Sequence, residues 1–427
     1  MNPSIGKYRW TVVALLFFAT TINYLDRQVI GLLKPVLETE FSWTETDYGH
    51  IVMAFSAAYA IGLLIFGRII DRIGTKLGYI ISIIAWSFAA IGHAFASSTF
   101  GFGVARAALG LGEAGNFPAA IKSVAEWFPK KERAFATGIF NSGANIGAVV
   151  APIMVPWILG VYGWEEAFII TGLIGFVWLI FWWIFYEIPA RQKRLSKAEF
   201  DYIHSDNEVD TSSEAPVKWS KLFAIRQTWA FLLGKMLTDP IWWFFLFWLP
   251  SYFSTTFQID LKKPSLELVI VYTATTIGSI GGGYLSGYLI RRGLPVFRAR
   301  KVSMLIFALC VAPIMLAQFA PNVWVAVGLI SLAAAAHQAW SANIFTTASD
   351  MFPKKAVSSV VGIGGMAGAV GGIFFPMLVG YLLDSYKAAG NIGAGYSLIF
   401  VICGCAYLLA WVVMHFFAPK MEVVKLD

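Results

Sequence analysis

The stretch Glu126-Trp-Phe-Pro-Lys-Lys131 recurs in the second half of the chain as Asp350-Met-Phe-Pro-Lys-Lys355. The two copies lie 224 residues apart, from 126 to 350, and the same offset relates further glycines and prolines. These further pairs are Gly138 and Gly362, Gly147 and Gly371, and Pro152 and Pro376. An ungapped series of this length indicates an internal duplication, so the chain should consist of two similar halves.

The composition indicates a membrane protein. Of the 427 residues, 58% are hydrophobic and 13% are charged, whereas a soluble domain carries roughly a quarter charged residues. The hydrophobic residues form runs of about twenty, each long enough to cross a bilayer as a helix. The expected spans are 10–32, 48–68, 77–97, 100–124, 135–159, 166–187, 228–254, 266–290, 302–320, 322–349, 357–383 and 394–417. We therefore predict an all-α membrane protein with twelve transmembrane helices.

The repeat predicts how these spans are grouped. Six spans separate the two copies, an even number, so both copies face the same side of the membrane. The halves should then be pseudo-symmetric six-helix bundles related by an axis along the membrane normal. A polar stretch between them gives a first bundle at 1–188, a linker at 189–227 and a second bundle at 228–427. Within the linker, Ser196 and Glu199 have capping-box spacing, so a short surface helix can start there.

The basic residues predict the orientation. If the N-terminus is cytoplasmic, most Lys and Arg fall in inside segments, and the outside loops carry only Lys34, Lys262, Lys263 and Lys387. By the positive-inside rule, both termini are expected in the cytoplasm. The formal net charge of +7 is therefore read as a topology signal, and nucleic-acid binding is not expected because the basic residues are scattered over short loops.

Two similar bundles predict a transporter. In such proteins the substrate site lies near the midplane between the halves, which rock against each other. The sequence has no G-x-x-x-x-G-K-[ST] loop for nucleotide hydrolysis, so an ion gradient or the substrate's own gradient must supply the energy. Cys310, Cys403 and Cys405 lie inside spans without ligand spacing, and we expect neither a metal nor a cofactor. A membrane-embedded enzyme is the less favoured alternative, because no nucleophile–base pair has suitable spacing.

Spans 1 and 4 carry charges that need a polar or paired environment. Arg106 and Glu113 are two turns apart on one helix face, whereas the adjacent Asp26 and Arg27 point about 100° apart and cannot simply pair. Cross-pairing of these four is expected, and a static ion-pair cluster is the structural alternative. The residues of spans 1 and 4 that we expect at a polar interior are Asn23, Tyr24, Asp26, Arg27, Arg106, Glu113 and Asn116.

Spans 7 and 10 carry the corresponding residues of the second half. Lys235 and Asp239 are four apart on one face, directly before Pro240, which tends to kink a helix. The candidate substrate-binding residues here are Lys235, Asp239, Trp242, His337, Gln338 and Asn343. For Trp242 and the span-10 residues, packing and interhelical hydrogen bonding are equally good interpretations.

The charges suggest a coupling mechanism. Three central carboxylates balance three central cations, so an anionic substrate must displace a carboxylate from the cation it uses. Protonation of Asp26 or Glu113 would remove that competition and free an arginine fork for a carboxylate. We therefore predict that Asp26 and Glu113 couple transport to protons, while Arg27 binds the substrate.

The loop Gly67-Arg-Ile-Ile-Asp71-Arg72-Ile-Gly74-Thr-Lys76 resembles the loop signature of the major facilitator superfamily, and the resemblance extends over essentially the whole chain. The resemblance implies a gating role for Gly67, Asp71 and Arg72. The equivalent loop of the second half departs from the pattern, because Arg291 occupies the acidic position.

Three further motifs narrow the resemblance. NYLDRQVIG, RAALGLGEAGNFP and GKMLTDPIWWFFLFWLP, in spans 1, 4 and 7, resemble the organic-anion symporter branch, and within it bacterial hexuronate transporters. This implies a monomeric carrier in the bacterial inner membrane that imports a hexuronate with protons. Another sugar acid or small carboxylate is the alternative, and the residues leave sodium coupling open.

Overall fold

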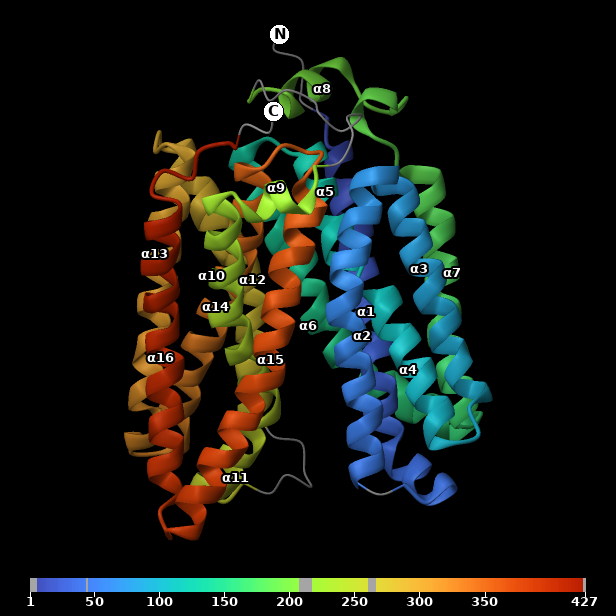
Figure 1. Ribbon diagram of the computed structural model, residues 1–427, viewed down its shortest axis with the longest axis vertical. Helices are drawn as coiled ribbons and strands as arrows, with labels where there is room; N and C mark the ends of the chain where they lie inside the picture. Colours follow the sequence, from blue (N-terminus) through green and yellow to red (C-terminus); the bar gives the residue numbers. More distant parts are fainter. Residues whose placement is uncertain (1–5, 44, 207–216, 260–265, 425–427) are drawn as a thin grey trace.

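The computed structural model describes residues 6–43, 45–206, 217–259 and 266–424, and every element assigned there is a helix. The outside-loop residues Lys262 and Lys263 and the linker segment 207–216 lie outside the described residues. The helices fall into two halves of six spans each, as predicted (Figure 1).

Two of the six spans in each half are assembled from more than one helical segment. The segments of the first half are α1 (Tyr8–Phe41), α2 (Glu45–Ile73), α3 (Thr75–Gly92) with η1 (His93–Phe95), α4 (Thr99–Glu113) with α5 (Asn116–Trp127), α6 (Lys130–Val161) and α7 (Trp164–Phe185). Those of the second half are α10 (Arg226–Phe247) with α11 (Leu249–Phe257), α12 (Leu266–Arg291), α13 (Val296–Val311) with η3 (Ala312–Phe319), α14 (Val323–Met351), α15 (Val357–Ala388) and α16 (Ile392–Phe417).

Three spans are less apolar or shorter than the rest. Within the described ranges, nine helices are long and apolar enough to cross a membrane by length and composition alone. The spans not among them are those built from α1, from α4 with α5, and from α10 with α11. These three carry the charged residues singled out above, so the spans that least resemble membrane helices are the ones that carry the charges of the candidate site.

The fourth span was expected as one helix and is instead broken at Ala114 and Gly115. The Ser82 hydroxyl of α3 donates to the Gly112 carbonyl at 2.6 Å, and a Cβ on Gly115 would lie 2.4 Å from the same hydroxyl. A side chain that takes a carbonyl from the helical ladder interrupts the helix. As a result, Asn116 begins α5 and does not continue the Arg106–Glu113 face.

A short helix, α8 (Lys197–Ile203), starts at the predicted position in the linker, between η2 (Pro189–Arg191) and α9 (Trp219–Phe223). The Ser196 hydroxyl accepts from the Glu199 N–H at 3.2 Å, which is one bond of the predicted capping box. The Glu199 carboxylate does not complete the box. It accepts from the backbone N–H groups of Tyr8 and Arg9, at 3.0 and 3.1 Å, and so fixes α8 to the start of α1.

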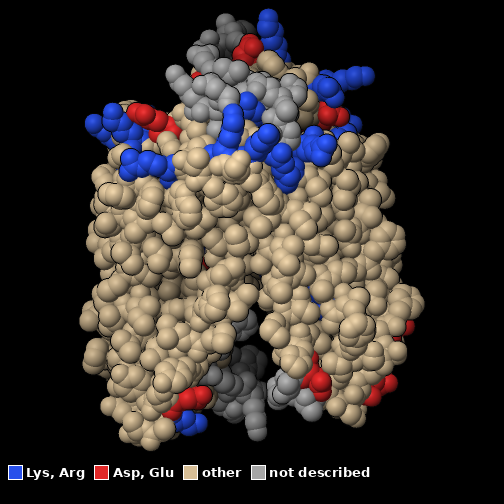
Figure 2. All heavy atoms as spheres, in the orientation of Figure 1, with Lys and Arg blue, Asp and Glu red and all other residues tan. Residues whose placement is uncertain are grey.

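The halves meet at one end of the molecule and diverge toward the other (Figure 1). We call the end that carries α8 and α9 the linker end, and the opposite end the far end. Lys and Arg gather at the linker end, and a hollow between the halves opens toward the far end (Figure 2). At the linker end, α2 packs against α15 and α6 packs against α12.

Glycines let these two seams close. A Cβ on Gly67 of α2 would lie 2.6 Å from the Ser358 carbonyl oxygen, and one on Gly138 of α6 would lie 2.3 Å from the Ser279 carbonyl oxygen. Gly283 of α12 is as tight, because its Cβ would lie 2.1 Å from the carbonyl oxygen of Ala134 on α6. Because these glycines lack a side chain, the helices of the two halves can approach closely, as is common at contacts between membrane helices.

Gly283→Ala is expected to open the linker end. The added methyl meets backbone, which cannot move aside, so the closed seam should be destabilised by about 1–3 kcal/mol. Gly281→Ala is the matched control, because a Cβ there meets nothing within 4 Å. The distance between spin labels at Leu77 on α3 and Val302 on α13, both exposed, would report the opening. Equal distance distributions for the two variants would contradict this role of Gly283.

Candidate functional site

A cavity with a volume of about 100 Å³ lies between the halves and is lined by both of them. Since one ordered water needs roughly 10–15 Å³ by such a measure, the space suits a small polar molecule. The predicted site residues that line it are Tyr24, Arg27, Lys235, Asp239, Trp242, His337 and Gln338. The predicted residues that are not among its lining are Asn23, Asp26, Arg106, Glu113, Asn116 and Asn343.

Arg27 is the cationic group that the first half presents to the cavity. Its Nε and Nη2 both donate to one oxygen of Glu113, Oε2, at 3.0 and 2.8 Å. Its guanidinium carbon also lies 4.7 Å from the ring centroid of Tyr24 and 4.8 Å from that of Tyr59. Glu113 is fully buried, and its second oxygen has no hydrogen-bond partner among the described residues. The Arg27 guanidinium is therefore held by Glu113 and the two tyrosine rings, and Arg27 still lines the cavity.

The expected cross-pairing of four charges is made only in part. Arg106 donates to the backbone carbonyl of Arg27 at 2.8 Å and forms none of the salt bridges found within the described ranges. Asp26 is 2% exposed, and neither carboxylate oxygen has a hydrogen-bond partner in the described part of the chain. Asp26 lies near Thr171 of α7, whereas Arg27, which points about 100° away on the same helix, lines the cavity.

Lys235 and Asp239 form the charged group of the second half. Their Nζ and Oδ2 lie 2.7 Å apart, and the ammonium also lies 3.8 Å from the ring centroid of Phe345. The Asp239 side chain is 23% exposed and that of Lys235 only 4%, so the carboxylate is the more accessible partner. Pro240 does not end the helix, which continues to Phe247.

Aromatic and amide groups complete the second half of the cavity. The rings of Trp242 and His337 are stacked, with centroids 5.3 Å apart and an angle of 3° between planes. The His337 ring is hydrogen-bonded to the Tyr407 hydroxyl. Gln338 accepts a hydrogen bond from Asn141 of α6 at 2.9 Å, and this bond joins the two halves.

Two predicted residues connect helices instead of facing the cavity. Asn343 donates to the carbonyls of Gly282 and Ala339, at 3.0 and 2.9 Å. Asn116 donates to the Thr20 hydroxyl at 3.3 Å and accepts from the Tyr79 hydroxyl. In this conformation Asn343 follows the interhelical hydrogen-bonding interpretation, and Asn116, which was expected at the polar interior, also bonds between helices.

Sequence reasoning missed several lining residues. Tyr59, Phe117, Asn141 and Phe345 line the cavity and lie in predominantly apolar runs. No charge distinguishes them, and the only signal was the polarity of Asn141 inside a span. Phe117 and Phe345 stack on each other across the halves, with centroids 5.1 Å apart.

The predicted gating loop contacts the other half through Asp71. Its carboxylate accepts from the backbone N–H groups of Ser358 and Ser359, at 3.2 and 2.6 Å, and pairs with Lys122 at 3.0 Å. Backbone N–H groups at a helix start attract an anion, so Asp71 is well placed at the first turn of α15. Gly67 contacts the same turn, whereas Arg72 is exposed.

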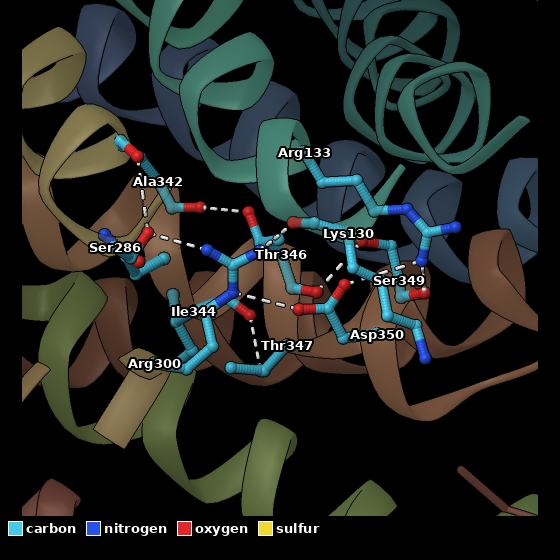
Figure 3. Close-up of polar contacts among 12 residues, drawn as sticks. Lys130, Arg133, Ser286, Arg300, Ala342, Ile344, Thr346, Thr347, Ser349 and Asp350 are labelled. Atoms are coloured by element: carbon cyan, nitrogen blue, oxygen red, sulfur yellow. Dashed lines mark hydrogen bonds and ion pairs between the residues drawn. The ribbon is translucent and has the colours of Figure 1, made fainter. Parts of the chain in front are cut away.

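Asp350 holds the α6–α12 contact between the halves, as Asp71 holds the α2–α15 contact. Figure 3 shows it between Arg300 and Arg133, whose guanidinium groups lie 2.9 and 3.4 Å from its two oxygens. Arg300 also donates to the Lys130 carbonyl across the halves, at 2.7 Å. The repeat counterpart of Asp350, Glu126, accepts instead from Thr75 and Tyr186 within its own half.

Comparisons with known proteins agree with this architecture. The model of the Major Facilitator Superfamily matches residues 16–376. The hexuronate transporter of Escherichia coli K12 is 33% identical, over 99% of this chain and 97% of that one. The galacturonate transporter of Dickeya chrysanthemi is 35% identical, over 66% of this chain and 82% of that one. The structure of the proton:xylose symporter XylE has a TM-score of 0.73 and 16% identity, covers 97% of each chain, and supports the fold alone.

Proposed function

Because the chain belongs to the Major Facilitator Superfamily of membrane transporters, we propose that it imports a sugar-acid anion by proton symport, and that the anion is a hexuronate such as glucuronate or galacturonate. The names of its relatives support the hexuronate, since a hexuronate and a galacturonate transporter align with it at 33% and 35% identity. Another sugar acid or small carboxylate is the competing substrate class. A small carboxylate would use the same cationic group but fewer of the polar groups opposite.

The observation that carries the proposal is the pairing of Arg27 with Glu113 at the edge of the cavity. Glu113 accepts from Nε and Nη2 of Arg27. A substrate carboxylate would compete with Glu113 for these two donors. A proton on Glu113 weakens its hold on Arg27, so proton binding and anion binding support each other. Asp26, buried without a partner in the described part of the chain, supplies a second protonation site one residue from Arg27.

The opposite side of the cavity suits the hydroxyl-bearing end of the substrate. The carboxylate of Asp239 accepts from hydroxyls, and Lys235 holds it and donates to ring oxygens. The stacked Trp242 and His337 rings offer an apolar face for a sugar ring. Because the two charged groups come from different halves, one ligand that bridges them can bias how the halves meet.

The orientation of the chain completes the proposal. The basic residues gather at the linker end, which the positive-inside rule puts in the cytoplasm of a bacterium, with the protein in the inner membrane. The hollow that opens at the far end then faces outward, ready to receive the substrate (Figure 2).

Uptake by purified protein in liposomes tests the substrate and the ion. Labelled glucuronate, galacturonate, galactonate and glucarate would be offered with an imposed pH gradient, with a sodium gradient, or with neither. Accumulation of the two hexuronates driven by the pH gradient is expected. Preference for another acid would overturn the hexuronate assignment, and accumulation driven by sodium alone would overturn proton coupling.

Asp239→Ala is expected to weaken hexuronate binding about 10- to 100-fold, because a charged acceptor for hydroxyl groups is lost. A short carboxylate without hydroxyls should compete at least as well as before, since Lys235 loses its intramolecular partner. Competition of glucuronate and of the short acid against labelled substrate measures both effects. Equal losses for the two competitors would mean that the pair is a static bridge.

A further inference from the structure

Two contacts between the halves close the cavity toward the linker end. The Nδ2 atom of Asn141 on α6 donates to Oε1 of Gln338 on α14, at 2.9 Å. The rings of Phe117 on α5 and Phe345 on α14 are stacked, 5.1 Å apart and 18° from parallel. All four residues line the cavity, so a bound molecule can touch both contacts.

The hydrogen-bonded side chains of Asn141 and Gln338, here called the amide pair, lie at the cavity end of the contact between α6 and the second half. Asn141 also donates to the Ser279 hydroxyl at 3.2 Å, and this hydroxyl donates to the Gly138 carbonyl at 2.9 Å. Further toward the linker end, Gly283 lies against the Ala134 carbonyl and Gly287 against that of Lys131. The contact therefore continues from the cavity to the linker end, and the amide pair is its member nearest the cavity.

The two contacts differ in how a polar ligand affects them. Asn141 and Gln338 are 4% and 5% exposed, so both amides are nearly withdrawn from water, and one hydrogen bond joins them. A ligand hydroxyl can replace either partner, and a ligand carboxylate can replace the acceptor Gln338, because one hydrogen bond is exchanged for another at little net change in free energy. The stacked rings offer no such exchange, since their contact is apolar.

We propose that the Asn141–Gln338 hydrogen bond is a ligand-operated latch that keeps the linker end closed while the cavity is empty. A hydroxyl of the bound sugar acid takes the place of one amide, which frees α6 from α14 at the first point of the seam. The identity of the ligand rests on the proposed function, whereas the latch itself does not. In this role Asn141 and Gln338 are positioning residues, and they set which state of the carrier is populated.

The test measures the closed state without ligand. Full-length protein with its three cysteines replaced would carry spin labels at Leu77 and Val302, or at the exposed far-end residues Phe100 and Phe319. Asn141→Ala and Gln338→Met, which nearly keeps the volume, should each raise the open-to-closed ratio at the linker end roughly three- to tenfold. The far-end distance should shorten in parallel.

Controls separate the latch from general loosening. Ser142→Ala on α6 and Thr346→Val on α14 remove buried hydroxyls whose hydrogen bonds among the described residues stay within their own helix, to Ile139 and Ala342, and should leave the ratio unchanged. The double variant Asn141→Ala with Gln338→Met should shift the ratio no further than Asn141→Ala alone, because both changes remove the shared bond and Asn141→Ala also removes the bond to Ser279. Additive shifts, or no shift, would overturn the latch.

The same samples distinguish the latch from the proposed substrate. Glucuronate should open the linker end of the parent and add much less to the opening of the latch variants. If glucuronate moves neither parent nor variants while the ligand-free shifts are as expected, the substrate assignment fails and the latch stands. If glucuronate opens the parent and the latch variants by equal factors, the ligand does not act through this bond, and the latch proposal fails.

Discussion

Arg27→Lys should reduce uptake of the sugar acid at least about a hundredfold, although the positive charge is kept. A lysine offers one ammonium, whereas Arg27 offers two parallel donors to a carboxylate and a planar face to aromatic rings. Tyr24 and Tyr59 lie at cation–π distances from that face, so the substituted ammonium also loses its rigid support. Uptake and counterflow exchange in liposomes, each at two pH values, measure the loss.

Acid pH should not restore the activity of this variant, since the missing element is the fork and not a proton. Arg106→Lys is the comparison, because Arg106 donates a single bond to a backbone carbonyl and does not line the cavity. Lysine can still donate one bond there, and a smaller loss is expected. If Arg27→Lys transports as well as the parent, the proposal that the Arg27 guanidinium binds the substrate carboxylate is wrong.

Glu113→Gln should abolish accumulation against a gradient and leave exchange of substrate across the membrane within about threefold of the parent. The amide resembles the protonated acid and leaves the Arg27 donors available at every pH. A pH difference of one unit supplies about 1.4 kcal/mol per proton, or roughly tenfold accumulation, and the variant should lose this factor for each proton that Glu113 carries. Counterflow at equal pH and uptake under an imposed gradient separate the two quantities.

Asp26→Asn distinguishes the two predicted coupling residues. Asp26 does not contact Arg27 through its carboxylate, so its replacement should change coupling without exposing the Arg27 donors. Binding in the Asp26→Asn variant should therefore keep its dependence on pH, whereas binding in the Glu113→Gln variant should lose it. The opposite pattern would assign the direct competition to Asp26.

The position of Arg27 follows from the sequence, and that of Asp26 does not. Charged residues are easily recognised in an apolar span, and helical spacing puts Arg27, three residues after Tyr24, on the same face as that tyrosine. Spacing alone cannot say which face meets α4 and which meets α7. The partner of Arg27 and the isolation of Asp26 are set by packing between helices that are far apart in sequence.

The duplicated halves were also predictable, since the hydrophobic runs give the number of spans and the repeat gives their grouping. The repeat did not predict that Asp350 would pair across the halves while Glu126 pairs within its own. It also gave no hint that Ser82 would interrupt the fourth span. Asn141 and Tyr59 line the cavity without any charge to mark them, and only the three-dimensional arrangement brings them there.

The charges of α1 also bear on how the protein is made. This helix leaves the ribosome before α4, carrying Asp26 and Arg27, while the partner of Arg27 lies 86 residues further along the chain. Each such charge at a helix centre adds roughly 2.5–3.5 kcal/mol to the free energy of insertion. During synthesis we expect α1 to remain beside the insertion machinery, or at the membrane edge, until α4 arrives. We expect a chain with Leu in place of Arg27 to enter the bilayer more readily and, if Arg27 binds the substrate as proposed, to lose transport.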